Sequence, residues 1–307
     1  MHVYLPIAEI SVDIFLLIGL GAAVGILSGV FGVGGGFLMT PLLMFIGVPP
    51  AVAVGSGANL LVATSITGVL AHWRRRSVDF KMGGVLLVGG VIGSTIGVFL
   101  FQKLQSIGQV DVVIGLSYVV FLGVIGSLMF FESVRSIARK RRGTAQRGKL
   151  HTHIWVHGLP FKMRFHKSRL YVSALLPLAV GAFVGLLAAI MGVGGGFIMV
   201  PAMIYLIGMP TSVVAGTSLF QILFVVMNVT LMQSWLNQTV DIILAVLMLV
   251  GSVVGVQLGT RLGNKLPGEQ FRVLLAVLVL ATCAGILFEL VATPNFPYSI
   301  TIQTGMK

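Results

Sequence analysis

Two glycine clusters are the residues of this chain best suited to holding a small charged solute. Residues 32–41 (GVGGGFLMTP) return with few changes at 192–201 (GVGGGFIMVP). Consecutive glycines let the backbone leave a helix, and the first N–H groups of the next helix then lack helical partners. Such N–H groups and the helix dipole together attract an anion. The duplicated motif therefore predicts an anion site, built mainly from backbone, at the junction of two related halves.

Uncharged polar side chains on the segments after the clusters could complete this site, because hydroxyl and amide groups supply hydrogen bonds without a fixed charge. The predicted substrate-binding residues are Gly34, Gly35, Gly36, Ser56, Asn59, Gly194, Gly195, Gly196, Thr217, Ser218 and Gln221. The alternative is a flexible kink or a tight helix crossing, with the hydroxyls bonded to the preceding turn. Duplication of all four glycines favours the site.

The same residues argue against catalysis. The apolar segments contain no Lys or Arg, no paired carboxylates and no Ser, His and Asp set with catalytic spacing, so an enzyme is not expected. The motif is no phosphate loop, because its spacing is not G-x-G-x-x-G and no Lys follows. Asp13, His72, Asp111 and Glu289 fall at predicted helix ends, where interfacial solvation accounts for them.

No metal, cofactor or nucleic-acid partner is expected. The histidines at 151, 153 and 157 have no carboxylate or cysteine near them in the sequence and are interpreted as surface residues. The single cysteine, Cys283, offers no disulfide.

The elements that position the clusters are membrane helices. The 307 residues are 57% hydrophobic and 9% charged, with a mean hydropathy of +1.05, whereas soluble domains carry about 25% charge. Segments long enough to cross a bilayer are predicted at 12–31, 51–71, 82–101, 110–131, 172–191, 212–235, 242–260 and 271–291. The segments after the clusters, 37–46 and 197–207, are too short to span and are interpreted as half-helices.

The predicted fold is an all-α polytopic membrane protein with two inverted repeats. Each repeat has three spanning helices plus a V-shaped pair made of a long and a half-helix. The predicted units are a first repeat (1–131), a basic cytoplasmic linker (132–170), a second repeat (171–292) and a tail (293–307). Inversion places 18 of the 20 Lys and Arg on the cytoplasmic side, as the positive-inside rule requires.

Two further patterns predict local structure. Glycines spaced by four at 89, 93 and 97, and again at 251, 255 and 259, predict close helix packing. Alternation of apolar and polar residues around Gly158 and Pro160 predicts a small cytoplasmic β-hairpin at 154–166.

The duplicated GVGGGF-x-M-x-P motif, the run AAIMGVGGGFIMVPAMIYLIGMPTSVVAGTSLFQ and the linker sequence LPFKMRFHKSRLYVSALLPL resemble the sulfite exporter TauE/SafE family, also called the TSUP family. The resemblance covers residues 15–290. It implies a multi-pass transporter, mostly of bacterial inner membranes, for sulfite or organosulfonates, with the family's paired glycine motifs at Gly32 and Gly34–Gly36 and at Gly192 and Gly194–Gly196.

The expected function is secondary transport of a small anion across the cell inner membrane, with a proton or another ion as a candidate coupling partner. Two alternatives stay open. One is a passive anion channel of the same architecture, and the other is a membrane-anchored sensor or assembly factor that acts through the basic linker. Substrate identity, direction and oligomeric state are left open by the sequence.

Overall fold

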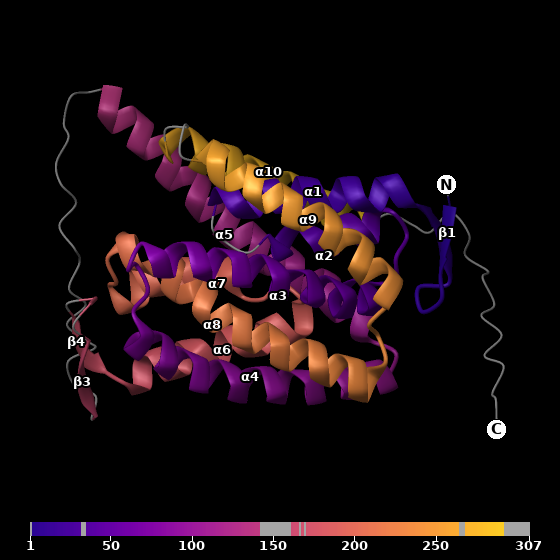
Figure 1. Ribbon diagram of the computed structural model, residues 1–307, viewed down its shortest axis with the longest axis horizontal. Coiled ribbons are helices and arrows are strands. Elements are labelled where there is room, and N and C mark those ends of the chain that lie inside the picture. The colour runs from indigo at the N-terminus through magenta and orange to yellow at the C-terminus, as the bar shows by residue number, and fades with distance from the viewer. Residues whose placement is uncertain are drawn as a thin grey trace.

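The computed structural model describes residues 2–31, 35–141, 161–165, 167–168, 170–263 and 268–291, which form a helical bundle with two β-hairpins (Figure 1). The first half contains β1 (His2–Leu5), β2 (Ile10–Asp13), α1 (Ile14–Phe31), α2 (Gly36–Phe45), α3 (Pro50–Arg74), α4 (Phe80–Ser106) and α5 (Val110–Arg141). The second contains β3 (Lys162–Phe165), β4 (Leu170–Ser173), α6 (Leu175–Met191), α7 (Gly196–Ala202), η2 (Met203–Ile207), α8 (Thr211–Met232), η3 (Gln233–Asn237), α9 (Ile242–Gly263) and α10 (Gly268–Val291).

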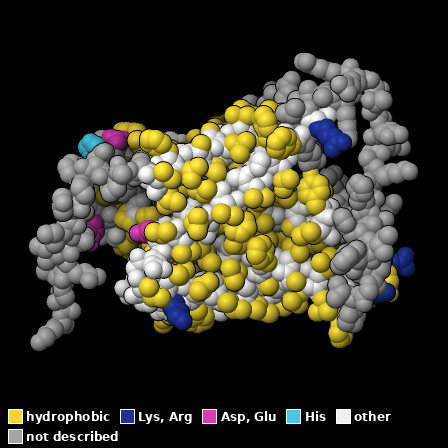
Figure 2. All heavy atoms as spheres, turned by 180° about the vertical axis from the view of Figure 1, so that it is seen from behind, with side chains coloured by type: hydrophobic (Ala, Val, Ile, Leu, Met, Phe, Trp, Pro, Cys, Tyr) yellow, Lys and Arg dark blue, Asp and Glu magenta, His cyan; other side chains and the backbone are white. Residues whose placement is uncertain are grey.

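The apolar segments predicted from the sequence are helical except at a few end residues, among them 12–13 and 172–173 in strands, which agrees with the all-α membrane class. Within the described residues, five helices are long and apolar enough to cross a membrane, in α3, α4, α5, α8 with η3, and α9. The surface agrees with this class, because hydrophobic side chains cover the middle of the face in Figure 2 and charged ones lie towards its edges. The longest helix, α5, continues to Arg141, so the segment predicted as linker begins as helix.

The β-hairpins differ from the prediction. The residues around Gly158 and Pro160 lie outside the described part of the chain. The observed hairpin pairs Lys162–Phe165 with Leu170–Ser173. Its second strand includes residues 172 and 173, which were predicted to begin a helix. Burial alternates along β3, which ends at the fully buried Phe165, whereas β4 buries both of its last two residues. Helix α6 therefore starts at Leu175.

A second hairpin, β1–β2, precedes α1 and was not predicted. It pairs His2–Leu5 with Ile10–Asp13. The two hairpins precede equivalent helices, yet Figure 1 shows them at opposite ends of the bundle. Both halves have the same order of elements: a hairpin, a helix, a short helix and three longer helices.

The halves interlock through glycine-lined crossings, which confirms the packing prediction for both glycine series. Helix α1 packs along α9, and α6 along α4. In α9 the glycines lie against carbonyl groups of α1, in the pairs Gly251 with Ile18, Gly255 with Ala22 and Gly259 with Ile26. In α4 they lie against α6, in the pairs Gly89 with Leu178, Gly93 with Ala182 and Gly97 with Leu186. A side chain at these positions would separate the helices.

The second half differs from the first by two π-helical turns, η2 and η3. Pro41 and Pro201 are 160 positions apart, Pro49 and Pro210 are 161 apart, and Asp79 and Asp241 are 162 apart. The increase in spacing from 160 to 161 falls across η2, and the increase from 161 to 162 falls across η3. Since a π-turn accommodates one additional residue in a helix, each turn accounts for one step in the spacing.

Candidate functional site

The two glycine clusters form matching backbone breaks at the starts of the short helices. Gly35 caps α2 with φ of 71°, and Gly195 caps α7 with φ of 74°. Glycine adopts this left-handed conformation at no steric cost, whereas other residues resist it. Each break folds back on the helix before it: Gly35 lies against Val24 and Ser28 of α1, and Gly195 lies against Val184 of α6.

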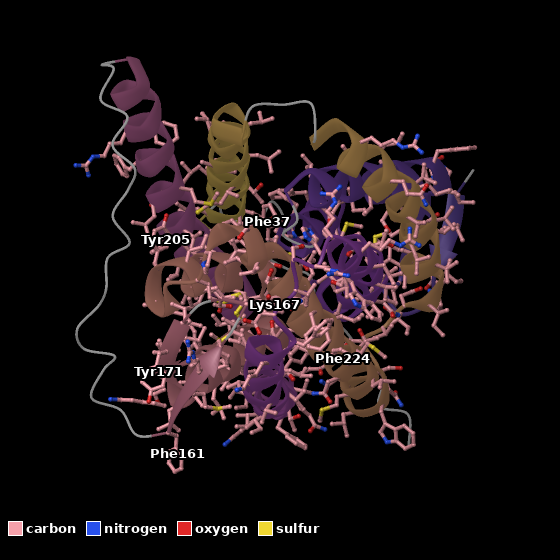
Figure 3. All side chains as sticks on the ribbon, turned by 60° about the vertical axis from the view of Figure 1, so that its left-hand side comes forward. Phe37, Phe161, Lys167, Tyr171, Tyr205 and Phe224 are labelled. Atoms are coloured by element: carbon pink, nitrogen blue, oxygen red, sulfur yellow. The ribbon has the colours of Figure 1, made fainter. Side chains whose placement is uncertain are left out.

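The breaks, far apart in sequence, meet in space. A Cβ atom at Gly36 would lie 2.7 Å from the carbonyl oxygen of Val193, beside the other break. The rings of Phe37 and Phe197, one residue into each short helix, stack with centroids 4.8 Å apart and planes 20° apart. Phe37 lies among the central helices in Figure 3. The predicted convergence of the two clusters is therefore present for Gly35, Gly36 and Gly194–Gly196, and Gly34 lies outside the described residues.

Helix geometry leaves backbone donors at this junction. Leu38 N–H donates to the Gly35 carbonyl at 3.2 Å, and Met199 N–H donates to that of Gly195 at 2.7 Å. The earlier N–H groups of α2 and α7, at Gly36 and Gly196, have no carbonyl of their own helix to bond. Two positive helix ends thus lie next to each other, an arrangement that suits an anion.

Apolar side chains cover the junction. Leu61 of α3 contacts the Gly36 and Gly194 positions, and Ile222 and Val226 of α8 contact Gly194. Leu61 and Ile222 stand 161 positions apart, so they are equivalent residues of the two halves. In this structure these side chains lie over the ends of the two short helices.

The two predicted hydroxyl ligands bond to backbone across the halves. Ser56 Oγ accepts a hydrogen bond from Asp241 N–H at 2.9 Å, and Thr217 Oγ1 accepts one from Asp79 N–H at 3.0 Å. Both hydroxyls are fully buried. Their position gives them a part in joining the halves, which the sequence did not predict.

The other predicted side chains have different surroundings. Ser218 donates to the Ala215 carbonyl at 3.0 Å, and Asn59 is half-buried on α3. Gln221 is fully buried, and among the described residues neither its Oε1 nor its Nε2 has a hydrogen-bond partner. Gln221 is thus the predicted ligand of which neither side-chain polar atom forms a hydrogen bond to a described residue.

Asp79 and Asp241 are structural residues that the site prediction missed. Asp79 accepts from Met82 N–H at 3.1 Å and from the Ser168 N–H and hydroxyl at 3.0 and 2.6 Å. Asp241 accepts from Leu244 N–H at 3.2 Å and from Ile7 N–H at 3.0 Å. Each carboxylate therefore caps a helix and holds one hairpin. The recurrence of Asp at matched positions in the two halves was the available signal.

Other clusters of charged groups are peripheral. Asp111 and Glu289 line an open hollow of about 190 Å³ between α2, α5 and α10. Among the described residues there is no group of three or more His, Cys, Asp or Glu side chains that could hold a metal ion.

Comparison of the sequence with known proteins finds membrane transporters. The family model for sulfite exporter TauE/SafE matches residues 17–286. The chain is 28% identical over 213 residues to the probable membrane transporter protein YunE of Bacillus subtilis, which is 67% of this chain and 72% of the relative. It is 30% identical over 219 residues to a probable membrane transporter protein of Xylella fastidiosa, 68% of this chain and 70% of the relative.

A more distant match is Sulfite exporter TauE/SafE family protein 3 of Arabidopsis thaliana, 27% identical over 115 residues, which is 37% of this chain and 22% of that protein. No solved structure matches the chain.

Proposed function

Because the chain belongs to the sulfite exporter TauE/SafE family and is a multi-pass membrane protein, we propose that it is a secondary transporter of a small sulfur-containing anion, of the sulfite or organosulfonate class. The observation that carries the proposal is the meeting of the two glycine breaks, because it brings two positive helix ends together. The solute site would lie at this junction, lined by Gly34–Gly36 and Gly194–Gly196, with Asn59, Ser218 and Gln221 on the neighbouring helices.

The proposed architecture is a pair of inverted repeats. The opposite placement of the hairpins supports it, as does the reciprocal bonding of Ser56 with Asp241 and Thr217 with Asp79. Each repeat would contribute three spanning helices and one broken pair. Movement of one repeat against the other would then expose the central site to each side of the membrane in turn.

The covering side chains fit this cycle. Leu61 and Ile222 lie over the breaks, where they would close the proposed site. Relative motion of α3 and α8 would withdraw one of them and admit the solute. Ser56 and Thr217 would act in this cycle as contacts between the repeats.

The proposed location is the cell inner membrane, with the basic segments in the cytoplasm. Arg74, Arg75, Arg76 and Lys81 lie at the same end of the bundle as β3–β4, where Lys81 Nζ donates to the Arg164 carbonyl at 3.1 Å. Cations gathered at one end favour that end as the cytoplasmic side. A proton or another ion is the proposed coupling partner.

The function is tested with purified protein in liposomes. Uptake of labelled sulfite, taurine and a simple carboxylate is measured with and without the same solute trapped inside. A carrier gives saturable uptake that internal solute accelerates, and sulfite or a sulfonate competes best. Flux that follows voltage without acceleration by internal solute would instead identify a channel, and absence of sulfite and sulfonate flux would refute the assignment.

A further inference from the structure

Gln221 is the one predicted ligand whose side chain is fully buried with both amide atoms unpartnered among the described residues. A buried amide without partners costs free energy for each unmade bond, so a structure that retains one calls for an explanation. The cost is higher among membrane helices, where no bulk water can intervene. The arrangement around Gln221 indicates what its partner is.

The amide lies against glycine. A Cβ atom at Gly90 of α4 would stand 2.5 Å from Gln221 Nε2, so any other residue at position 90 would collide with the amide. Position 90 also accommodates α6, because the Gly90 carbonyl contacts Gly185. Gly185 follows Val184, the residue that touches the Gly195 break. On α8, Gln221 directly precedes Ile222, which covers Gly194 of the second glycine break.

The equivalent place in the other half lacks this feature. The residue 161 positions before Gln221 is Leu60, which is fully buried, and the counterpart of Gly90 is Ser252, whose hydroxyl donates to the Leu249 carbonyl at 3.0 Å. The packing of these helices is therefore present in both halves, whereas the buried amide is present in only one. Support of the scaffold therefore does not explain Gln221.

We propose that Gln221 binds the transported solute through a pair of hydrogen bonds to a singly protonated oxyacid group. Oε1 accepts from the solute O–H, and Nε2 donates to an adjacent oxygen of the same group. Hydrogensulfite presents this pair of atoms, whereas the sulfonate of methanesulfonate or taurine has acceptors without an O–H. The inference rests on the proposed transport function and narrows its substrate class to protonated oxyanions.

The test compares Gln221→Leu and Gln221→Asn with Gln257→Leu, the same change at an exposed position of α9. Uptake of hydrogensulfite at mildly acidic pH and of methanesulfonate is measured in liposomes. Gln221→Leu is expected to raise the KM for hydrogensulfite at least about tenfold, because both bonds are lost, and to raise that for methanesulfonate less, because only the bond from Nε2 is lost. Gln221→Asn retains part of the affinity, and Gln257→Leu matches the unmodified protein.

Thermal unfolding gives a second, transport-independent readout. Without solute, Gln221→Leu should melt at or above the temperature of the unmodified protein, because an unpartnered amide has been removed. With hydrogensulfite, the unmodified protein gains melting temperature and Gln221→Leu does not. An unchanged hydrogensulfite KM in Gln221→Leu, or an equal loss for both solutes, would overturn the inference while leaving transport intact. Failure of the unmodified protein to bind or move either solute would instead refute the proposed function.

Discussion

The helices that follow the short helices, α3 and α8, occupy equivalent places in the two halves but have different polar content. Both begin after a proline, both bring a hydroxyl to an Asp N–H of the other half, and both cover the glycine breaks with an aliphatic side chain. The amides Gln221 and Asn228 of α8 stand where α3 has Leu60 and Thr67, and Asn59 of α3 stands where α8 has Phe220. Features needed to hold the halves together are duplicated, whereas the amides of α3 and α8 are not.

The largest expected effect comes from the helix crossings, which the halves share. Gly93→Val would force its side chain into the Ala182 carbonyl of α6, and Gly255→Val would force its side chain into that of Ala22 in α1. We expect both variants to lose folded protein in size-exclusion chromatography of detergent extracts, because overpacking a backbone contact leaves no room to adjust. Gly84→Val, whose Cβ position is open, is the control. Folding of either crossing variant would show that the close approach is dispensable.

Removal of the capping carboxylates should have the next largest effect. Asp79→Ala leaves the donors of Met82 and Ser168 without an acceptor, and Asp241→Ala does the same to those of Leu244 and Ile7. Each substitution is expected to cost roughly 1–3 kcal/mol of unfolding free energy. Melting temperatures measure the loss, and Asp→Asn, which keeps one acceptor oxygen, should recover part of it. A large loss at only one position would break the equivalence of the halves.

The hydroxyls that cross between the halves should contribute less. Ser56→Ala and Thr217→Val each remove one acceptor from a buried Asp N–H, for an expected cost of about 1 kcal/mol. Because these bonds join the halves, the variants should also change the transport rate while leaving the KM near its original value. A raised KM with unchanged melting temperature would return both hydroxyls to the ligand set predicted from the sequence.

The smallest effect should separate α3 from α8. Asn228 Nδ2 donates to the hydroxyls of Ser94 and Thr95 at 2.9 and 3.2 Å, whereas Thr67 Oγ1 donates within its own helix to Ala63 at 3.1 Å. Asn228→Leu is expected to cost about 0.6 kcal/mol, as for other polar contacts between membrane helices, and Thr67→Val close to nothing. Equal melting temperatures for the two variants would remove the distinction.

The sequence predicts the helices and the glycine breaks because both depend on local chemistry. Apolar runs of spanning length and residues that permit positive φ are visible without knowledge of partners. The glycine series are also predictable, since a spacing of four defines one helix face. The hairpin β1–β2 was missed because its strands are only four residues long and β2 runs directly into the apolar segment of α1.

Side-chain roles within the candidate site depend on contacts that sequence cannot supply. Ser56 and Thr217 have the composition of ligands, yet their partners lie in the other half of the chain, 185 and 138 residues away. Leu61 and Ile222 resemble ordinary core residues, and only the structure places them over the breaks. Matched Asp residues were visible, but their bonds to the hairpins were not.

The most direct test of the central claim is a structure of the protein with hydrogensulfite bound. The account predicts density for the anion at the starts of α2 and α7, within hydrogen-bonding distance of their first N–H groups, with Leu61 or Ile222 displaced. Density at the hollow formed by Asp111 and Glu289, with the glycine breaks still covered, would contradict it.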